Sequence, residues 1–370
     1  MIMTLLPDGS DMSYATRMVR YGTVSTALAL LSDRRLRRLV DEAPVVGSGI
    51  GGTSALLNLD GVPVFVKRIP LTDRERRPDA VMSTANLFDL PAFCQYGVGS
   101  PGFGAWRELV ANTMTTNWVL TGRTEAFPLM YHWRVLPGAP PVAEEHADVD
   151  RAVAYWGGSP AVRHRLDALA RASASIVLFL EHVPQNLQDW LATQPVGVEG
   201  TDAYSMVERG LRAGTAFMHG NGVLHFDAHF RNILTDGRRL YFADLGLATS
   251  PRFDLSADES AFLRHHLSHD ACYVVTQLVN WLVTNVCGVA VPDTGGPAER
   301  DEYVRRCAAG GTPADVPPAA AAIITRYAPV AAIMNAFYWD LFGTDRATPY
   351  PAERLRTPFA SVLAAGPEAG

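Results

Sequence analysis

The most informative pattern in the chain lies at residues 223–248, which read V-L-H-F-D-A-H-F-R-N-I-L-T-D-G-R-R-L-Y-F-A-D-L-G-L-A. Asp227 is followed five residues later by Asn232, and Asp244 opens an Asp-Leu-Gly triplet. The Asp-Gly pair at 236–237 separates two short apolar runs, and this arrangement predicts a β-hairpin. We expect a loop to present Asp227 and Asn232, and the hairpin to carry the chain on to Asp244. Carboxylate and amide oxygens suit Mg2+ that is held together with substrate phosphates.

This pattern resembles the catalytic core of the protein-kinase superfamily, which carries His-Arg-Asp, then Asn after four residues, then Asp-Phe-Gly. Here residues 225–227 read His-Phe-Asp, Asn232 follows, and residues 244–246 read Asp-Leu-Gly. The resemblance implies that Asp227 is the base that orients the acceptor hydroxyl, and that Asn232 and Asp244 hold Mg2+. The main departure is the phenylalanine in place of the family's arginine. A hairpin whose acidic residues share no role is the alternative interpretation.

The composition of the chain limits the classes of protein to which it can belong. The chain has 370 residues, of which 48% are hydrophobic, and this is enough for a large core or two lobes. Its net charge of −6 lacks the basic excess that nucleic-acid binding favours, so we expect no nucleic-acid partner. The four cysteines form no C-x-x-C pair, which argues against a zinc site or a disulfide framework and indicates a reducing, cytoplasmic location. The first residues lack a basic region followed by an apolar core, so we expect no export signal.

Residues 271–292 are uncharged and long enough to span a bilayer. Gln277, Asn280 and Asn285 interrupt this apolar run. We therefore predict a buried helix and no membrane span, and the kinase resemblance implies such a helix at the centre of the C-terminal lobe. The resemblance also implies that Asp270, just before this run, braces the backbone of the catalytic loop.

A glycine-rich turn precedes two predicted strands, the second of which ends in a lysine, and this order resembles the nucleotide-binding part of kinases. Residues 47–52 read Gly-Ser-Gly-Ile-Gly-Gly, and fifteen residues further on comes Val-Phe-Val-Lys, which ends at Lys67. Residues 59–62, Leu-Asp-Gly-Val, supply a turn between two strands. Glycines let backbone N–H groups approach phosphates without a Cβ clash. By resemblance, Lys67 binds the α- and β-phosphates of ATP beneath the three glycines that fit G-x-G-x-x-G, which are Gly47, Gly49 and Gly52.

A kinase-like lysine needs a glutamate on a helix to fix it. Glu75, Glu108 and Glu125 are the candidates that follow Lys67. Glu75 lies in the charged run T-D-R-E-R-R-P and is too close to Lys67 in the sequence. Glu108 lies in a run with helical apolar spacing. We therefore predict that Glu108 pairs with Lys67. This choice makes residues 78–104 an insertion, to which the sequence assigns no function.

Two further strands and a helical segment precede the predicted catalytic loop. Residues 127–136 predict a strand and residues 148–172 predict helix. A buried strand then ends at Glu181-His182-Val183, which resembles the strand that enters the kinase hinge. The resemblance implies that the backbone of Glu181 and Val183 hydrogen-bonds the adenine edge of ATP.

These elements predict an α+β protein, and the resemblance implies a bilobal protein-kinase-like fold. A small antiparallel β-sheet lobe with one helix would precede a larger, mainly helical lobe. We expect an N-terminal helical extension at 1–43 and an N-lobe at 44–183, with insertions near 78–104 and 148–172. The C-lobe would occupy 184–370 and end in helices. The sequence does not fix the oligomeric state.

The resemblance implies a kinase that moves the γ-phosphate of ATP to a hydroxyl acceptor with the help of Mg2+. The glycine turn and the Asp-Leu-Gly triplet favour a serine/threonine protein kinase. The alternative is a small-molecule kinase of the aminoglycoside or choline type, favoured by His229 and by the lack of an Ala-Pro-Glu motif. A catalytically inactive scaffold is a third class, and the intact set Lys67, Asp227, Asn232 and Asp244 argues against it.

Overall fold

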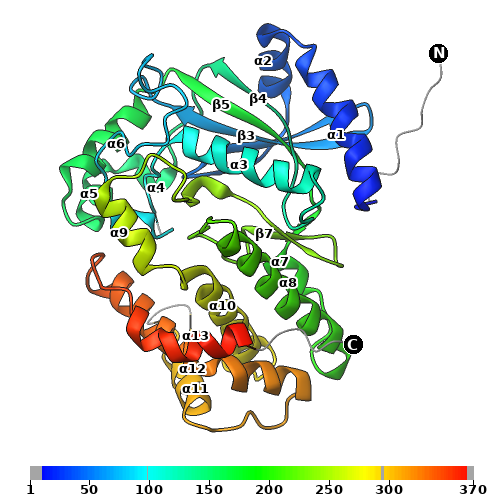
Figure 1. The fold of residues 1–370 in the computed structure, drawn as a ribbon, viewed down its shortest axis with the longest axis vertical. Helices are drawn as coiled ribbons and strands as arrows, with labels where there is room; N and C mark the ends of the chain where they lie inside the picture. Colours follow the sequence, from blue (N-terminus) through cyan, green and yellow to red (C-terminus); the bar gives the residue numbers. More distant parts are fainter. Residues whose placement is uncertain (1–10, 98, 293–295, 365–370) are drawn as a thin grey trace. The chain divides into compact units, whose positions relative to one another are not determined.

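The computed structural model describes residues 11–97, 99–292 and 296–364 of a mixed α+β protein (Figure 1). Two compact units divide the chain. The first unit combines Met1–Pro184 with Ala243–Ser256, and the second combines Gln185–Phe242 with Ala257–Gly370. The main boundary lies one residue beyond the predicted one, and the segment Ala243–Ser256 groups with the first unit although we expected it in the C-terminal part. The first ten residues of the predicted extension and the last six of the predicted C-lobe lie outside the described residues.

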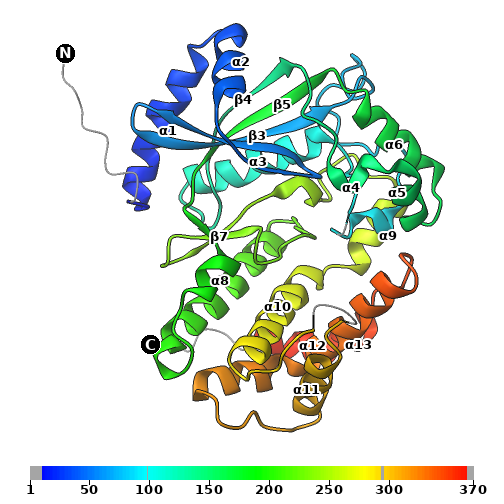
Figure 2. The ribbon, with the colours of Figure 1, turned by 180° about the vertical axis from the view of Figure 1, so that it is seen from behind.

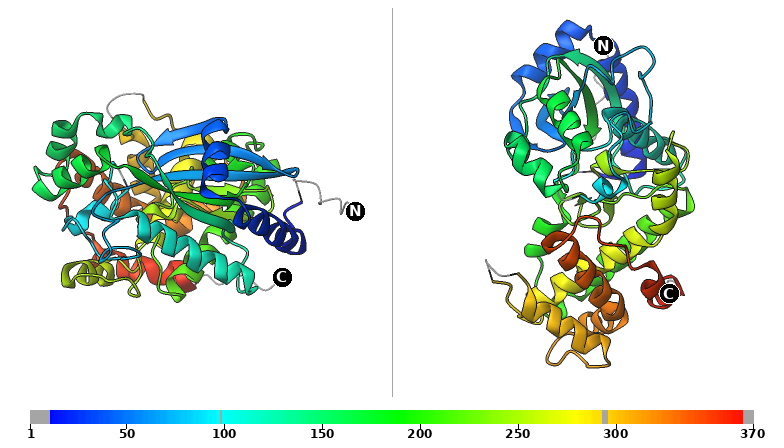
Figure 3. Two further views of the ribbon diagram at one scale, coloured as in Figure 1. Left: turned by 90° about the horizontal axis from the view of Figure 1, so that it is seen from above. Right: turned by 90° about the vertical axis from the view of Figure 1, so that its left-hand side faces the viewer.

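The first unit contains a five-stranded antiparallel sheet with the order β1-β2-β3-β5-β4. β5 is buried along nearly its whole length because it is a central strand. In the view from above, the blue and green strands run alongside one another (Figure 3). The strands span Val45–Gly49 (β1), Gly52–Leu59 (β2), Val62–Leu71 (β3), Met130–Pro137 (β4) and Ala174–Glu181 (β5).

The turn between β2 and β3 has the chemistry that the sequence predicted. Asp60 and Gly61 both have positive φ, at 52° and 87°, as the tight turn of a two-residue hairpin requires. The Gly61 N–H donates to Oδ1 of Asn58 at 2.9 Å. This turn fixes the register in which β3 pairs with β2, and β3 carries Lys67.

Three helices pack on this sheet, and two of them begin at serine caps. Ser13 caps α1 (Tyr14–Ala29) and Ser32 caps α2 (Asp33–Glu42). α3 (Ala105–Leu120) lies along one face, in front of the strands in Figure 1 and behind them in Figure 2. Its contact with the sheet is an apolar cluster that includes Ile69, Leu71, Trp106, Leu109, Ile176 and Leu178.

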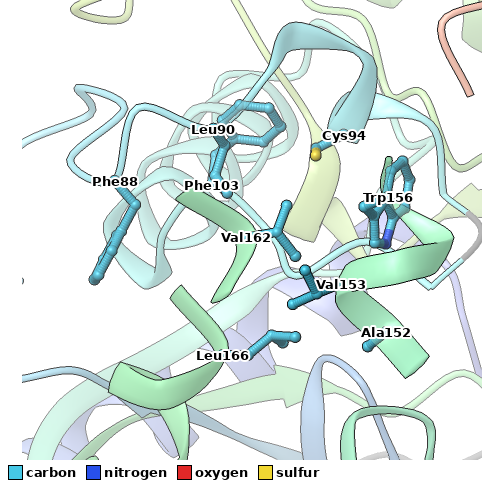
Figure 4. Packing of buried hydrophobic residues seen from close by; sticks show 9 residues of the cluster. All are labelled: Phe88, Leu90, Cys94, Phe103, Ala152, Val153, Trp156, Val162 and Leu166. Atoms are coloured by element: carbon cyan, nitrogen blue, oxygen red, sulfur yellow. The ribbon is translucent and has the colours of Figure 1, made fainter. Parts of the chain in front are cut away.

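The two predicted insertions form one substructure with its own core (Figure 4). The segment 148–172 is helical as expected, although glycines at 157 and 158 break it into two helices. Phe88, Leu90, Cys94 and Phe103 of the 78–104 segment pack against apolar residues of these helices. The elements are η1 (Ala92–Gln95), α4 (Glu144–Ala147), α5 (Val149–Tyr155) and α6 (Pro160–Ala170).

The second unit is mainly helical in its described part. A small sheet pairs β6 with β7 and β7 with β8, and the predicted hairpin is confirmed, with Gly237 at φ 81°. Its strands are β6 (Gln185–Asn186), β7 (Ile233–Thr235) and β8 (Leu240–Phe242). Its α-helices are α7 (Leu187–Ala192), α8 (Thr201–Gly220), α9 (Ala257–His265), α10 (His269–Asn285), α11 (Ala298–Ala308), α12 (Pro318–Gly343) and α13 (Ala352–Ala364), and a 3-10 turn, η2 (Val198–Gly200), precedes α8.

Two apolar helices of this unit pack against each other. α10 covers most of the run that we predicted to be a buried helix, and most of its apolar residues are buried. α12 is long and apolar enough to cross a membrane by length and composition alone, but half of that apolar window is buried. Because α12 packs on α10 and α11, its composition is that of a core helix.

The first unit takes in more of the chain than the second. We expected a small sheet lobe with one helix, preceded by a helical extension and carrying two insertions, and a larger helical lobe. The described residues of the first unit include α1 to α6. The N-terminal helices and both insertions belong to this unit together with the sheet.

Candidate active site

β-strand geometry turns Lys67 toward α3. Side chains alternate along a strand, so Lys67 shares a face with Ile69 and Leu71, which pack on α3. The first turn of α3 carries Glu108. Lys67 and Glu108 are each about 95% buried, so their charges meet away from bulk water.

The structure brings three predicted residues together in the first unit. The Lys67 Nζ lies 2.6 Å from Oε1 of Glu108 and 2.7 Å from Oδ1 of Asp244. The second contact is a hydrogen bond in which the ammonium donates. Asp244 is the more accessible of the two acids, with 43% of its side chain exposed against 5% for Glu108. One carboxylate therefore anchors the lysine, and the other remains open to solvent.

The charges of this cluster are strongly coupled. Burial alone would lower the pKa of the Lys67 ammonium, but the carboxylates of Asp244 and Glu108 outweigh burial and raise that pKa above its ordinary value. Burial raises the pKa of Glu108 to about 7; Lys67 opposes this rise and Asp244 adds to it. At neutral pH the Lys67 side chain is therefore protonated, while the Glu108 carboxyl titrates close to neutrality.

Lys67 is the only lysine of the chain, and every other residue counted with it as a cation is arginine. An ammonium is a compact point charge, whereas a guanidinium is a planar fork. A sequence that uses arginine everywhere else and keeps one buried lysine therefore points to a chemical need at this position. This signal was available in the sequence, and our sequence analysis did not use it.

The backbone at Asp244 is unusual. Asp244 has left-handed dihedrals, φ 56° and ψ 71°, and a 3-10 turn, η3 (Leu245–Leu247), follows it. A Cβ on Gly246 would lie 3.2 Å from Oε2 of Glu108 and 3.4 Å from Oδ1 of Asp244. A side chain at position 246 would crowd the Glu108 carboxylate. Non-glycine residues with positive φ, such as Asp244, concentrate at functional sites.

The glycines of the turn between β1 and β2 are not equivalent. Gly52 has φ 115°, and a Cβ there would lie 2.0 Å from the Arg68 carbonyl oxygen, so glycine is obligatory. Gly47 and Gly49 are predicted site residues, but a Cβ would meet at most ordinary contacts at either. Gly51, which the G-x-G-x-x-G pattern leaves out, approaches the lysine instead. A Cβ on Gly51 would lie 3.0 Å from the Lys67 Nζ.

The end of β5 is held by a residue of the N-terminal helix. The Arg17 Nε and Nη2 donate to the Glu181 carboxylate at 2.9 Å and 2.7 Å, and both side chains are buried. The Glu181 N–H donates to the Leu129 carbonyl oxygen at 2.7 Å. The predicted adenine contact of Glu181 is therefore restricted to its carbonyl group. Val183, the other predicted adenine residue, is buried in the same unit.

In the second unit, a buried carboxylate braces the predicted catalytic loop. Asp270, at the start of α10, accepts hydrogen bonds from the backbone N–H groups of His225 and Phe226, the latter at 3.0 Å. This is the contact that the kinase resemblance implied. Burial alone would raise the pKa of Asp270, but hydrogen bonds and charge from His269, together with His225, hold it below its ordinary value.

Asp227 and Asn232 lie together in this loop. The Asn232 Nδ2 donates to the Asp227 carbonyl oxygen and to its Oδ2, both at 3.0 Å. The Asn232 N–H also donates to the His229 carbonyl oxygen at 2.8 Å, which closes the turn. The His229 Nε2 lies 3.9 Å from Oδ1 of Asp227, so an imidazole accompanies the predicted base.

Phe226 occupies the position where the kinase family has arginine. Its φ of 62° is a strained value for a bulky residue, and the Asp270 carboxylate holds its backbone. The ring is buried and stacks on His269 at a centroid distance of 4.8 Å, with Phe262 at 5.7 Å and His266 at 5.8 Å. An aromatic cluster therefore surrounds the side chain at the position where the kinase resemblance would place a cation.

The donor chemistry fits Mg2+ better than a transition metal. Within the described residues, no group of three or more His, Cys, Asp or Glu side chains could hold a metal ion. Mg2+ does not need such a cage, because it binds through one or two protein oxygens together with phosphates and waters. Asp244 offers a partly exposed carboxylate. Asn232 uses its amide nitrogen toward Asp227, so its amide oxygen is the atom it would offer.

Two charged residues that matter for the geometry were missed. We set Glu75 aside because it lies in a charged run and is close to Lys67 in sequence, but it is 99% buried and paired with Arg165 at 2.9 Å. Arg17 was not identified at all. Each of these side chains is neutralised by a partner distant in sequence, which a local pattern does not reveal.

The sequence matches no protein-family model and no curated protein.

Proposed function

We propose that this protein is an ATP- and Mg2+-dependent phosphotransferase with a protein-kinase-like bilobal fold, and that its acceptor is a serine or threonine hydroxyl of a protein. The observation that carries the proposal is the single lysine of the chain, buried against Glu108 and Asp244. A buried ion pair contributes little to stability by itself, so its retention calls for a functional reason. Phosphate binding by a fixed ammonium is that reason.

Each residue has a distinct role in this proposal. Lys67 binds the α- and β-phosphates, and Glu108 fixes the ammonium. The backbone of the β1–β2 turn, with Gly47, Gly49, Gly51 and Gly52, covers the phosphates. The Glu181 carbonyl group and the Val183 backbone would bind adenine. Asp244 and Asn232 would hold Mg2+, which neutralises phosphate charge when bound.

The chemical step transfers the γ-phosphoryl group to a hydroxyl oxygen. The new bond joins that oxygen to the γ-phosphorus, the bond from the γ-phosphorus to the bridging oxygen breaks, and ADP leaves. Asp227 orients the hydroxyl and takes its proton. The hydrogen bonds from Asn232 keep the Asp227 carboxylate in one orientation, which is the positioning that a loose transition state needs.

A small-molecule hydroxyl is the second candidate acceptor, and one observation favours it. His229 stands two residues after Asp227, where serine/threonine kinases place a lysine that touches the transferring phosphate. Its Nε2 lies 3.9 Å from the predicted base. The antibiotic and choline kinases that the loop also resembles carry histidine there.

The test is incubation with γ-labelled ATP and Mg2+ in three reactions: enzyme alone, enzyme with generic protein substrates, and enzyme with a host-cell small-metabolite extract. Labelled protein supports the first acceptor class, and a labelled metabolite supports the second. Absence of ATP turnover in all three would identify an inactive scaffold and overturn the proposal.

The controls use the single lysine. K67M should remove labelling while the far-ultraviolet circular dichroism stays unchanged. K67R keeps the positive charge but replaces the point charge with a fork, so it should also lose most activity. Full activity in both variants would show that the label is transferred by a contaminating kinase.

A further inference from the structure

A second buried ion pair lies behind the lysine cluster in the first unit. The Arg165 Nη1 lies 2.9 Å from Oε2 of Glu75, and both side chains are at least 95% buried. The same oxygen accepts hydrogen bonds from the N–H and hydroxyl of Thr72 at 3.0 Å and 2.6 Å. Burial alone would raise the pKa of Glu75, but Arg165 and these hydrogen bonds hold it below its ordinary value. Glu75 is therefore a carboxylate fixed on all sides.

Glu75 also caps the helix that carries Glu108. The Ala105 N–H donates to Oε1 of Glu75 at 2.8 Å, and the Trp106 Nε1–H donates to the Glu75 carbonyl oxygen at 2.8 Å. α3 has no cap from its own N-cap residue, Gly104. A carboxylate at a helix N-terminus satisfies an orphan N–H group and complements the helix dipole.

Glu75 joins the two elements that carry the lysine pair. It follows the end of β3 at Leu71, and β3 carries Lys67. Its carboxylate meets α3 at Ala105, three residues before Glu108. The start of α3 is thus held at a fixed distance from the end of β3.

The insertions carry Arg165, the ion-pair partner of Glu75, and hold its side chain in place. Arg165 belongs to α6, and its Nε donates to the Pro101 carbonyl oxygen at 3.4 Å while its guanidinium lies 5.0 Å from the ring centroid of Phe88. Phe88 is part of the apolar core that joins the 78–104 segment to α5 and α6 (Figure 4). That segment also reaches the chain after Asp244: the Gln95 amide donates to the Leu247 carbonyl oxygen.

We propose that Glu75 and Arg165 are positioning residues that set the Lys67–Glu108 pair for phosphate binding, and that the two insertions exist to hold them. This proposal rests on the proposed function and names the device that keeps its nucleotide site assembled. The pair acts through α3 and does not touch the substrate.

The test compares wild-type enzyme with E75Q and with the double variant E75Q/R165M. E75Q leaves the Arg165 charge buried without its carboxylate and can fail to fold. The double variant removes both charges and so avoids an unpaired buried charge. Matched controls come from the same helix, α6. V162A removes core volume, and R163M removes one member of an exposed ion pair with Asp150.

The first readout does not depend on enzymatic activity. Because Lys67 is the only lysine, acylation by acetic anhydride can be followed at one side chain by mass spectrometry. Acylation needs a free amine, and the Lys67 Nζ is buried in contact with Oδ1 of Asp244 at 2.7 Å and Oε1 of Glu108 at 2.6 Å. If α3 shifts, Glu108 withdraws and acylation of Lys67 should accelerate at least several-fold. V162A and R163M should match wild type in this assay.

The second readout is turnover. Misplacing a positioned group by about 1 Å can cost about 100-fold in rate. We therefore expect kcat/KM for ATP to fall about 100-fold in E75Q/R165M and to stay within about twofold of wild type in V162A, even where both lose similar thermal stability. Wild-type acylation and wild-type kcat/KM in the double variant would overturn the positioning role. Accelerated acylation in a protein whose wild type never turns over ATP would support the positioning role and overturn the proposed function alone.

Discussion

The two groups of predicted site residues are held in place by different interactions. In the first unit, Lys67 contacts Glu108 from a helix and Asp244 from a segment far along the chain, and the contacts are ionic. In the second unit, Asp227 and Asn232 lie in one short loop. The neutral amide of Asn232 holds them together by donating hydrogen bonds to the backbone carbonyl and the carboxylate of Asp227. The first arrangement depends on charge balance, and the second depends on backbone shape. Substitutions and pH should therefore affect them differently.

The largest expected effect separates the two aspartates. D227N should bind Mg·ATP like wild type and lose about a thousandfold or more in turnover, at about 1.4 kcal/mol of barrier per tenfold. D244N should lose Mg2+-dependent nucleotide affinity, because the proposed metal ligand would be removed. The measurements are calorimetric ATP affinity across a Mg2+ titration and single-turnover rates.

The control for this comparison is N232A. Asn232 is the second proposed metal ligand, so N232A should resemble D244N, with a smaller loss of affinity. If D227N abolished Mg2+-dependent binding while D244N did not, the roles of base and metal ligand would be assigned to the wrong residues.

The second prediction tests the brace of the loop. D270A leaves the N–H groups of His225 and Phe226 without their buried acceptor, and a hydrogen bond to a charged group contributes about 1.5–3 kcal/mol. We expect a loss of about 3 kcal/mol in unfolding free energy, together with a fall in turnover because Phe226 no longer holds its left-handed backbone. Denaturant unfolding and kcat measure the two effects.

V275A provides the matched control, because Val275 is a buried residue of the same helix. It should lower stability through lost apolar contacts and leave kcat close to wild type. An equal loss of kcat in V275A would mean that Asp270 acts only on stability.

The loop and the hairpin could be predicted from sequence because their information is local. Asp227 and Asn232 are five residues apart, and the Asp-Gly turn that follows has a strong conformational preference. Glu108 was also found, because apolar spacing identified its helix before any contact was known. Spacing alone did not reveal that Asp244 reaches Lys67.

Long-range charge pairing set the limit of the sequence analysis. Glu75 lies among arginines and an aspartate, which locally indicates a solvated run. Its burial follows from Arg165, which is 90 residues away, and from the N-terminus of α3. Residues 78–104 were recognised as an insertion by length and residues 148–172 by a helical pattern. Neither local signal indicates that their apolar residues pack together.

The third prediction uses pH to distinguish the two units. Glu108 has its folded pKa raised from 4.5 to about 7, so between these values the folded state keeps a proton that the unfolded state has lost. Stability should therefore fall as pH rises through this window, by at most about 1.4 kcal/mol per pH unit. Asp270 has a lowered folded pKa, so its stabilising contribution should be lost only in acid, below its ordinary value of 3.8.

The measurement is the thermal unfolding midpoint of wild type relative to E108Q from pH 4.5 to 8. The advantage of E108Q should grow with pH, because the variant has no carboxylate to ionise at that position. A constant difference across this range would show that Glu108 is ionised throughout, and that the ion pair with Lys67 outweighs burial.

The smallest expected effect is no effect at all, and it concerns activation by phosphorylation. In many protein kinases the arginine before the catalytic base binds a phosphorylated activation segment. Here that position is Phe226, whose ring is buried in an aromatic cluster. In the segment Ala243–Ser256, the side chains of Thr249 and Ser250 are buried and inaccessible to a modifying enzyme.

That segment is already held by other means. The Asp254 N–H donates to Oγ1 of Thr84 at 2.8 Å, and Gln95 binds the Leu247 carbonyl oxygen. We therefore expect phosphatase-treated enzyme and an S256A variant, which removes the exposed hydroxyl, to keep the kcat of freshly purified protein. Q95A should instead reduce kcat, because it releases the segment that follows Asp244. A large loss on phosphatase treatment that incubation with ATP restores would contradict this, and would mean that a phosphate, rather than the 78–104 insertion, orders the segment.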